Sequence, residues 1–126
     1  MVEGFDYVHD SFTATASTAH SKIQNAGYDG VVVVADVTAV DTADADETYE
    51  FQLQGWDPVS ETWYTIATTG DVAGDGVSLH RLRVHPALTE AANEKISDII
   101  PEYIRVNVAL GGTSPSITYT LRIEMV

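Results

Sequence analysis

Alternating apolar and polar positions recur along most of the chain, and they predict β-strands. In residues 48–67, Tyr49, Phe51 and Leu53 alternate with polar residues, and a turn with an Asp-Pro step leads into a second run over residues 63–66. A two-residue period is typical of a strand that buries one face. The second run is rich in the aromatic and β-branched residues that strands favour. The stretch therefore predicts a β-hairpin whose apolar row builds the core.

Other runs extend this pattern over the rest of the chain. Residues 104–110 and 117–125 both alternate apolar with polar side chains, and the turn sequence GGTSP lies between them. The valine-rich run 31–40 predicts a strand that is buried on both faces, or nearly so, and residues 79–84 predict a short strand. Strands joined by hairpins, with longer loops between the pairs, favour an all-β fold, an antiparallel β-sandwich of the jelly-roll or Greek-key type.

One segment has helical rather than strand spacing. Apolar residues within 86–100 recur at helix-like intervals, and Pro101 ends the run, so we expect at most one short helix of one or two turns. Residues 1–28 are polar and irregular, and they predict an N-terminal arm. Residues 29–126 then form the β-sandwich domain, which gives the chain a single folded domain.

The balance of charges narrows the range of partners. Nineteen acidic residues against six basic ones give a formal net charge of −13. A surface of this sign repels phosphate backbones and anionic lipids, so we expect no nucleic acid and no membrane as a partner. The N-terminus lacks the basic and apolar regions of a signal peptide, and no apolar run approaches the roughly 18 residues of a membrane span. We therefore expect a protein that is made in the cytoplasm.

The residue types that carry catalysis or hold cofactors form no recognisable motif. The chain has no cysteine, which excludes disulfides, thiolate metal sites and a cysteine nucleophile. The four histidines lack metal-ligand spacing, and neither a nucleophile elbow nor a phosphate-binding glycine loop occurs. We expect no enzyme activity, catalytic residue, cofactor or bound metal. Acidic residues crowd the loops 41–47 and 68–78, and they are either solvated or hold calcium through their carboxylates.

A contact surface is the function that these residues predict instead. Arginines are the bases best able to pair with an acidic partner, and the aromatic residues of the arm are suited to burial on a neighbouring subunit. Trp56, in the turn region, suits an exposed ring or one that a partner covers, and an exposed ring there leaves carbohydrate binding open. The candidate interface residues are Phe5, Tyr7, Phe12, Trp56, Arg81, Arg83 and Arg105.

The hairpin and the C-terminal segment also carry a family resemblance. The sequences QLQGWD at 52–57 and ETWYTI at 61–66 are followed later by YIRVNV at 103–108 and GGTSPS at 111–116. Together they resemble the jelly-roll capsid cement (decoration) proteins of tailed bacteriophages, with a likeness that spans roughly residues 29–126. The turn is usually a short Asp-Gly type in those proteins, whereas here no glycine follows the aspartate.

The resemblance implies a virion structural protein without catalysis. Such proteins bind the outside of an assembled capsid, often as dimers or trimers at symmetry axes, and bridge neighbouring capsid subunits against the pressure of the packaged DNA. We therefore expect the major capsid protein and further copies of this chain as partners. The expected location is the outer capsid surface, after synthesis in the host cytoplasm. A carbohydrate-binding module and a phage tail or baseplate component are the alternatives.

Overall fold

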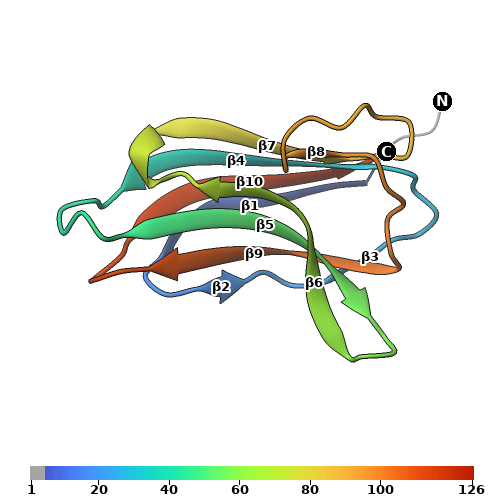
Figure 1. Cartoon of the computed structure of the whole chain (residues 1–126), viewed down its shortest axis with the longest axis horizontal. Coiled ribbons are helices and arrows are strands. Elements are labelled where there is room, and N and C mark those ends of the chain that lie inside the picture. The colour runs from blue at the N-terminus through green and yellow to red at the C-terminus, as the bar shows by residue number, and fades with distance from the viewer. Residues whose placement is uncertain (1–4) are drawn as a thin grey trace.

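Two β-sheets packed face to face make up the protein (Figure 1). The structure, a computed structural model, describes residues 5–126. Sheet A contains, in order, β1 (Phe5–Ala14), β10 (Ile117–Met125), β4 (Val31–Val40), β7 (Ser78–Val84) and β8 (Lys95–Ile96). Sheet B contains, in order, β2 (Thr18–Ala19), β9 (Tyr103–Gly111), β5 (Thr48–Asp57) and β6 (Thr62–Asp71), and β3 (Ile23–Gln24) also pairs with β9.

The strand order is that of a jelly roll. β2 and β3 both pair with β9 and so occupy one strand position, and β8 is a two-residue strand beyond β7 at the edge of sheet A. When β2 and β3 are counted as one strand and β8 is left out, eight strands remain. Numbered 1 to 8 along the chain, they follow the order 1-8-3-6 in sheet A and 2-7-4-5 in sheet B. Successive strands alternate between the sheets except within the β5–β6 hairpin, as in a double Greek key. The predicted fold class is confirmed.

Alternation along the strands places the core between the two sheets. Tyr49, Phe51 and Leu53 of β5 are fully buried, as predicted, and their register pairs them with the inward row of β9. The ring of Phe51 meets the ring of Tyr119 from β10 edge to face, with centroids 5.2 Å apart. Burying a side chain of this size contributes about 1.5–3 kcal/mol relative to leaving it exposed. These inward rows therefore hold the two sheets together.

The valine-rich strand β4 is buried on one face only, so the prediction of burial on both faces is wrong. Val31, Val33 and Val37 point into the core and are almost fully buried, whereas Val32 and Val34 are half-buried on the outer face of sheet A. No second layer covers this outer face in the described part of the chain (Figure 1). Sheet A thus carries valines where water reaches them.

Residues 86–100 form turns and the strand β8, so the predicted helix is wrong. Ala92 has a φ of +51°, which a right-handed helix does not permit. The N–H groups of Arg83 and His85 donate to the carbonyl oxygens of Glu94 and Ile96 at 2.8 and 3.2 Å. This pairing satisfies the edge of β7 and outweighs local helix propensity. A short 3-10 turn, η1 (Ala73–Asp75), occurs in another loop.

The segment predicted as an N-terminal arm belongs to the sandwich from Phe5 onward. β1 pairs with β10 from Phe5 opposite Met125 to Ala14 opposite Ile117, with a bulge between His9 and Phe12. β2 and β3 then pair with β9 in the other sheet. The predicted boundary at residue 28 therefore does not coincide with a change in the pairing, and residues 1–4 lie outside the described part.

No helix within the described residues is long and apolar enough to cross a membrane.

The turn between β9 and β10 depends on a glycine. Gly112 has a φ of +91°, and a Cβ atom there would lie 2.5 Å from the carbonyl oxygen of Asp46 and 2.7 Å from the Cα of Glu47. The carboxylate of Asp46 accepts hydrogen bonds from the N–H and the hydroxyl of Thr113 at 3.0 and 2.8 Å. The β9–β10 turn and the loop 41–47 therefore pack backbone to backbone at this end of the sandwich.

The Gly112→Ala substitution is expected to destabilise the protein by more than the Gly70→Ala substitution. Both glycines have positive φ, which costs an alanine about 1–2 kcal/mol, but nothing lies within 4 Å of a Cβ atom at Gly70. Only Gly112→Ala also forces the backbone of residues 46–47 to move. Urea unfolding of the two variants measures the difference, and equal losses of unfolding free energy would contradict the packing described.

Candidate binding faces

The outer face of sheet A combines apolar and basic side chains. The strand registers place Val8, Arg122, Val34 and Arg81 in one row across four strands. The next row holds Glu124, Val32, Arg83 and Lys95. We name this surface the valine–arginine face, and its members are Val8, Val32, Val34, Leu79, Arg81, Arg83, Lys95 and Arg122.

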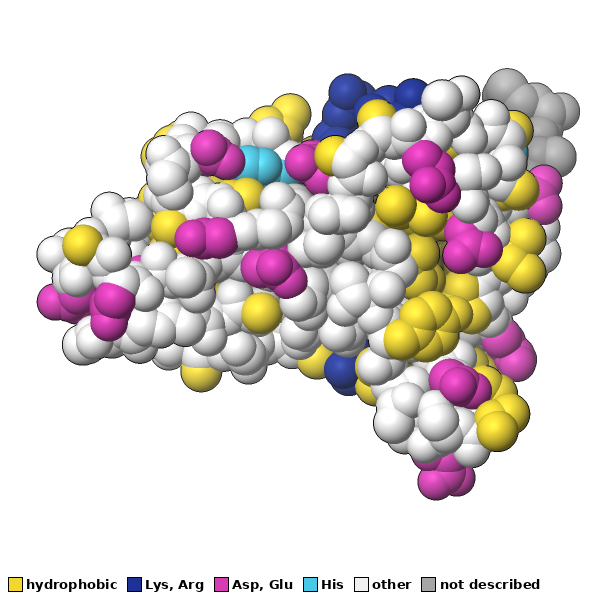
Figure 2. All heavy atoms as spheres, viewed as in Figure 1, with side chains coloured by type: hydrophobic (Ala, Val, Ile, Leu, Met, Phe, Trp, Pro, Cys, Tyr) yellow, Lys and Arg dark blue, Asp and Glu magenta, His cyan; other side chains and the backbone are white. Residues whose placement is uncertain are grey.

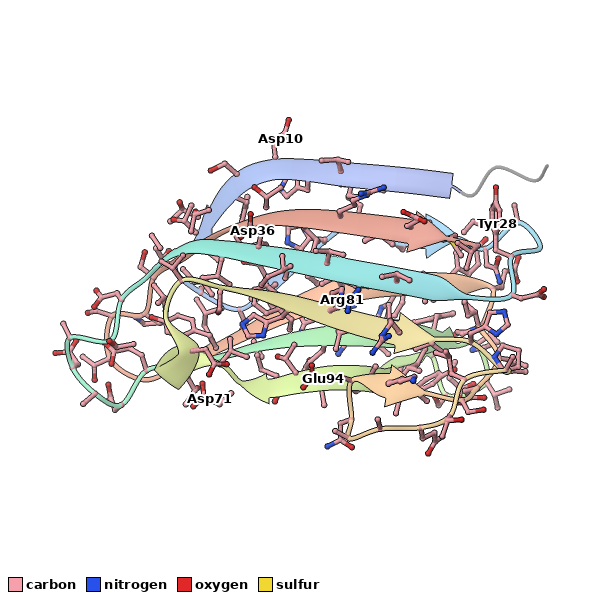
Figure 3. The ribbon with its side chains drawn as sticks, turned by 90° about the horizontal axis from the view of Figure 1, so that it is seen from above. Asp10, Tyr28, Asp36, Asp71, Arg81 and Glu94 are labelled. Carbon is pink, nitrogen blue, oxygen red and sulfur yellow. The ribbon has the colours of Figure 1, made fainter. Side chains whose placement is uncertain are left out.

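The apolar members of the valine–arginine face reach solvent. The side chain of Val8 on β1 is 53% exposed and that of Leu79 on β7 is 62% exposed. Figure 3 looks onto this face from outside, with β1, β10, β4 and β7 side by side and Arg81 on β7. Val32 and Val34 therefore lie on the middle strand of sheet A, and Val8 lies on its edge strand.

Basic residues are concentrated on the valine–arginine face, which also carries the acidic residues Glu124 and Asp36. Four of the six basic residues lie here, in a protein with a net charge of −13. Figure 2 shows dark blue side chains gathered at the top of the view, over the β7–β8 edge, while acidic side chains are scattered elsewhere. Arg122 pairs with Glu124 at 2.9 Å, and the buried Nε of Arg83 has no hydrogen-bond partner. The predicted residues Arg81 and Arg83 thus lie side by side on one face.

The outer face of sheet B carries a cavity lined by aromatic rings. The cavity has a volume of about 290 Å³, and its walls are Lys22, Trp56, Trp63 and Tyr103. Trp56 and Trp63 are cross-strand partners at the end of the β5–β6 hairpin, and their ring centroids are 5.3 Å apart. Figure 1 shows this end of the hairpin projecting from the body of the sandwich. The Nζ of Lys22 lies 4.8 Å from the centroid of the Tyr103 ring.

A ladder of polar side chains continues from the cavity along sheet B. The Nε of Arg105 donates to Gln54 Oε1 at 2.8 Å, and its guanidinium carbon lies 4.3 Å from the centroid of the Trp63 ring. Gln52 Oε1 accepts from Asn107 Nδ2 at 2.9 Å and from Gln54 Nε2 at 3.3 Å. Partial burial lowers the pKa of Arg105. We name the cavity and this ladder together the aromatic–amide face.

The sequence prediction found part of the aromatic–amide face and missed the rest. It included Trp56 and Arg105 but did not select Trp63, Lys22 or Tyr103. The alternation of side chains along the hairpin gives the direction of Trp63. Trp56 is three residues from the buried Leu53 and so points outward, and Trp63 is its hairpin partner.

The aromatic residues Tyr7 and Phe12 of the predicted arm do not belong to either outer face. Phe12 packs against the ring of Tyr119 at 5.9 Å and against His20 at 5.4 Å, so it is partly buried at the margin of the core. Tyr7 also packs partly buried against the core. The side chain of Phe5 lies outside the described part. Tyr7 and Phe12 therefore contribute part of their surface to packing within this subunit.

The two acidic loops meet at one end of the sandwich. They line an open hollow of about 850 Å³ to which both Glu47 and Asp71 contribute. Glu47 is buried, and its Oε1 accepts the N–H of Asp44 at 3.0 Å. The Oδ1 of Asp71 accepts the N–H groups of Tyr49 and Ala73, each at 3.0 Å. No group of three or more histidine, aspartate or glutamate residues in the described chain is arranged to hold a metal ion.

Comparison with known proteins gives no family for the chain. No protein-family model matches it, and no curated protein matches its sequence. The features that bear on function are therefore the two outer faces and the resemblance carried by the hairpin and the C-terminal segment.

His20 is expected to make the stability of the protein fall in mild acid. Burial lowers its pKa from the ordinary value of 6.5, neighbouring His9 lowers it further, and its Nε2 lies 2.7 Å from the Tyr119 hydroxyl. Below about pH 6.5 the unfolded chain binds a proton at this ring that the folded chain resists. The contribution of His20 to the free energy of unfolding should therefore be fully present above that pH, and it should be lost as the pH falls toward 5.

Urea unfolding at pH 7.5, 6.5 and 5.5 measures this effect. The His20→Gln variant keeps a hydrogen-bonding group beside Tyr119 but does not titrate, so its stability should decline less over the same range. The His9→Gln variant removes a neighbour that helps to lower the pKa of His20, so its stability should decline less than that of the parent protein over the same range. If the stability of His20→Gln declines as much as that of the parent protein, the loss of stability in mild acid comes from other groups.

Proposed function

We propose that this chain is a virion structural protein that binds the outer surface of a capsid and stabilises the shell by bridging neighbouring major capsid subunits. The observation that carries the proposal is the valine–arginine face. The exposed Val8 and Leu79 and the half-buried valines of β4 lie there among four basic residues, with Glu124 and Asp36 beside them, in a chain that is strongly acidic as a whole. The resemblance to capsid cement proteins supports the same role, as does the jelly-roll order of the strands.

The physics of this face suits a protein partner with acidic and apolar groups. Burial of Val8, Leu79 and the half-buried valines contributes roughly 25 cal/mol per Å² of apolar area removed from water. Arginine is enriched among the residues that dominate binding energy, and its guanidinium pairs with carboxylates through two parallel hydrogen bonds. The acidic remainder of the surface repels the same partner. The basic face therefore sets the orientation in which the chain docks.

Binding to capsids assembled from the major capsid protein of the same genome tests the proposal. The Arg81→Glu variant is expected to lower affinity at least about tenfold, because it places a like charge against the acidic partner. Lys22→Glu is the matched control, since it makes the same charge change at an exposed residue on the opposite sheet. Co-sedimentation at several protein concentrations gives both affinities. No binding by the parent protein, or equal loss in both variants, would overturn the proposal.

We also propose that the chain acts as a dimer or trimer, as the resemblance implies. β1 is a ten-residue strand at the edge of sheet A, and in the described part of the chain it pairs with β10 alone. An unpaired edge of this length offers backbone N–H and C=O groups to another chain. The edge therefore provides a route to a symmetric assembly.

Light scattering of the purified protein at micromolar concentration should give the mass of a dimer or trimer. The monomer mass is 13.6 kDa, so the two oligomers are well separated from it. The mass of the protein released from capsids gives the same quantity for the bound form. A monomer in both measurements would contradict self-association, while leaving capsid binding to be judged by co-sedimentation.

A further inference from the structure

The aromatic–amide face has the features of a small-molecule site rather than of a second protein-docking patch. Its cavity of about 290 Å³ is lined by three aromatic rings and one lysine. Aromatic rings present flat apolar faces, and tyrosine and tryptophan are suited to sites that are apolar at one end and wet at the other. Concave sites of this kind, with a few fixed polar groups, are typical of ligand binding.

The ladder beside the cavity supplies fixed hydrogen-bonding groups. Gln52, Gln54, Asn107 and Arg105 are held by hydrogen bonds of 2.8–3.3 Å to one another. These contacts fix the rotamers before a ligand arrives, so less conformational entropy is lost on binding. Amide groups both donate and accept hydrogen bonds, which suits the hydroxyl groups of a sugar. The groups point outward from positions two residues apart on β5 and β9, so they form a row.

The charge next to the cavity is positive. Lys22 forms part of the cavity wall, and Arg105 lies over the Trp63 ring beside it. These are the two basic residues that do not belong to the valine–arginine face. A ligand that reaches the cavity therefore meets two cations, whereas a long polyanion is repelled by the net charge of −13. The site favours a ligand with an isolated negative charge.

We propose that the aromatic–amide face binds an oligosaccharide that contains an acidic sugar, of the sialic or uronic acid class. A pyranose ring stacks in the cavity on Trp56, the sugar carboxylate pairs with Lys22, and hydroxyl groups of the next sugar bond to Gln52 and Asn107. This function goes beyond shell binding and does not depend on it. The outer faces of the two sheets point in opposite directions (Figure 1), so a chain docked through sheet A presents this site to the surroundings.

A peptide is a weaker fit to the same surface. Protein-binding patches of sheets are typically apolar at their centre, but the central row of this face consists of the amides and guanidinium of the ladder. The arrangement of rings beside amides therefore favours a sugar over a peptide.

Intrinsic fluorescence provides a direct test, because both tryptophans of the chain lie in the cavity. The isolated protein is titrated with sialyllactose and lactose, and with a disaccharide containing glucuronic acid and its neutral counterpart. A saturable change of emission is expected with at least one acidic sugar, at an affinity on the order of tenfold tighter than for its neutral counterpart. A proline-rich peptide, whose rings also stack on tryptophan, is titrated in parallel.

Two variants and one control locate the binding. Trp56→Ala is expected to weaken binding at least about tenfold, with Trp63 still present as the reporter. Lys22→Gln, at an exposed position, should abolish the preference for the acidic sugar while keeping affinity for the neutral one. Arg81→Gln on the valine–arginine face is the control and should leave both titrations unchanged. Calorimetry repeats each measurement without relying on the tryptophans.

Several results would overturn the proposal. One is the absence of a saturable signal with all four sugars at tens of millimolar. Another is sugar binding that Trp56→Ala and Lys22→Gln leave intact, and a third is saturable binding of the peptide alone. None of these results bears on capsid binding, because the titrations contain no capsids and the capsid experiment tests a different face.

Discussion

The edge-to-face contact between Phe51 and Tyr119 is the packing interaction on which the rest of the structure depends. The two rings come from β5 in sheet B and β10 in sheet A, and both side chains are 0% exposed. Side chains alternate along a strand, so placing these residues inward fixes the direction of every neighbour. Gln52 therefore points outward from β5, and Arg122 points outward from β10. The outer faces are a consequence of how the core is packed.

The distribution of basic residues gives those two outer faces different chemistry. Four bases share sheet A with half-buried valines, whereas Lys22 and Arg105 lie beside aromatic rings on sheet B. In a chain of net charge −13, each small positive region attracts a negative partner against a repelling background, which favours a defined orientation over strong attraction from all sides. Since the faces point in opposite directions, a protein partner on one leaves the other open to a smaller ligand.

The sequence predicted candidate residues that share one strand better than groups of residues that different strands bring together. Arg81 and Arg83 were predicted as contact residues, and they lie side by side because both occur at outward positions of one strand. Trp56 and Arg105 were predicted separately, and only the pairing of β5 with β6 and β9 brings them together around Trp63. The residues that complete the cavity come from segments far apart in the chain, and no local pattern reports such proximity.

The sequence by itself determined the two-residue period, and with it the inward rows, the hairpins and the β-sandwich class, because the direction of a side chain in a strand depends only on parity. Tertiary structure decided the rest. Residues 86–100 are helical in spacing but pair with the edge of β7, and β1 joins β10 although more than 100 residues separate Phe5 from Ile117. Hydrogen bonds to a distant strand edge outweigh local propensity, which is worth less than about 1 kcal/mol per residue. The same long-range pairing decided which valines stay exposed and which rings line a cavity.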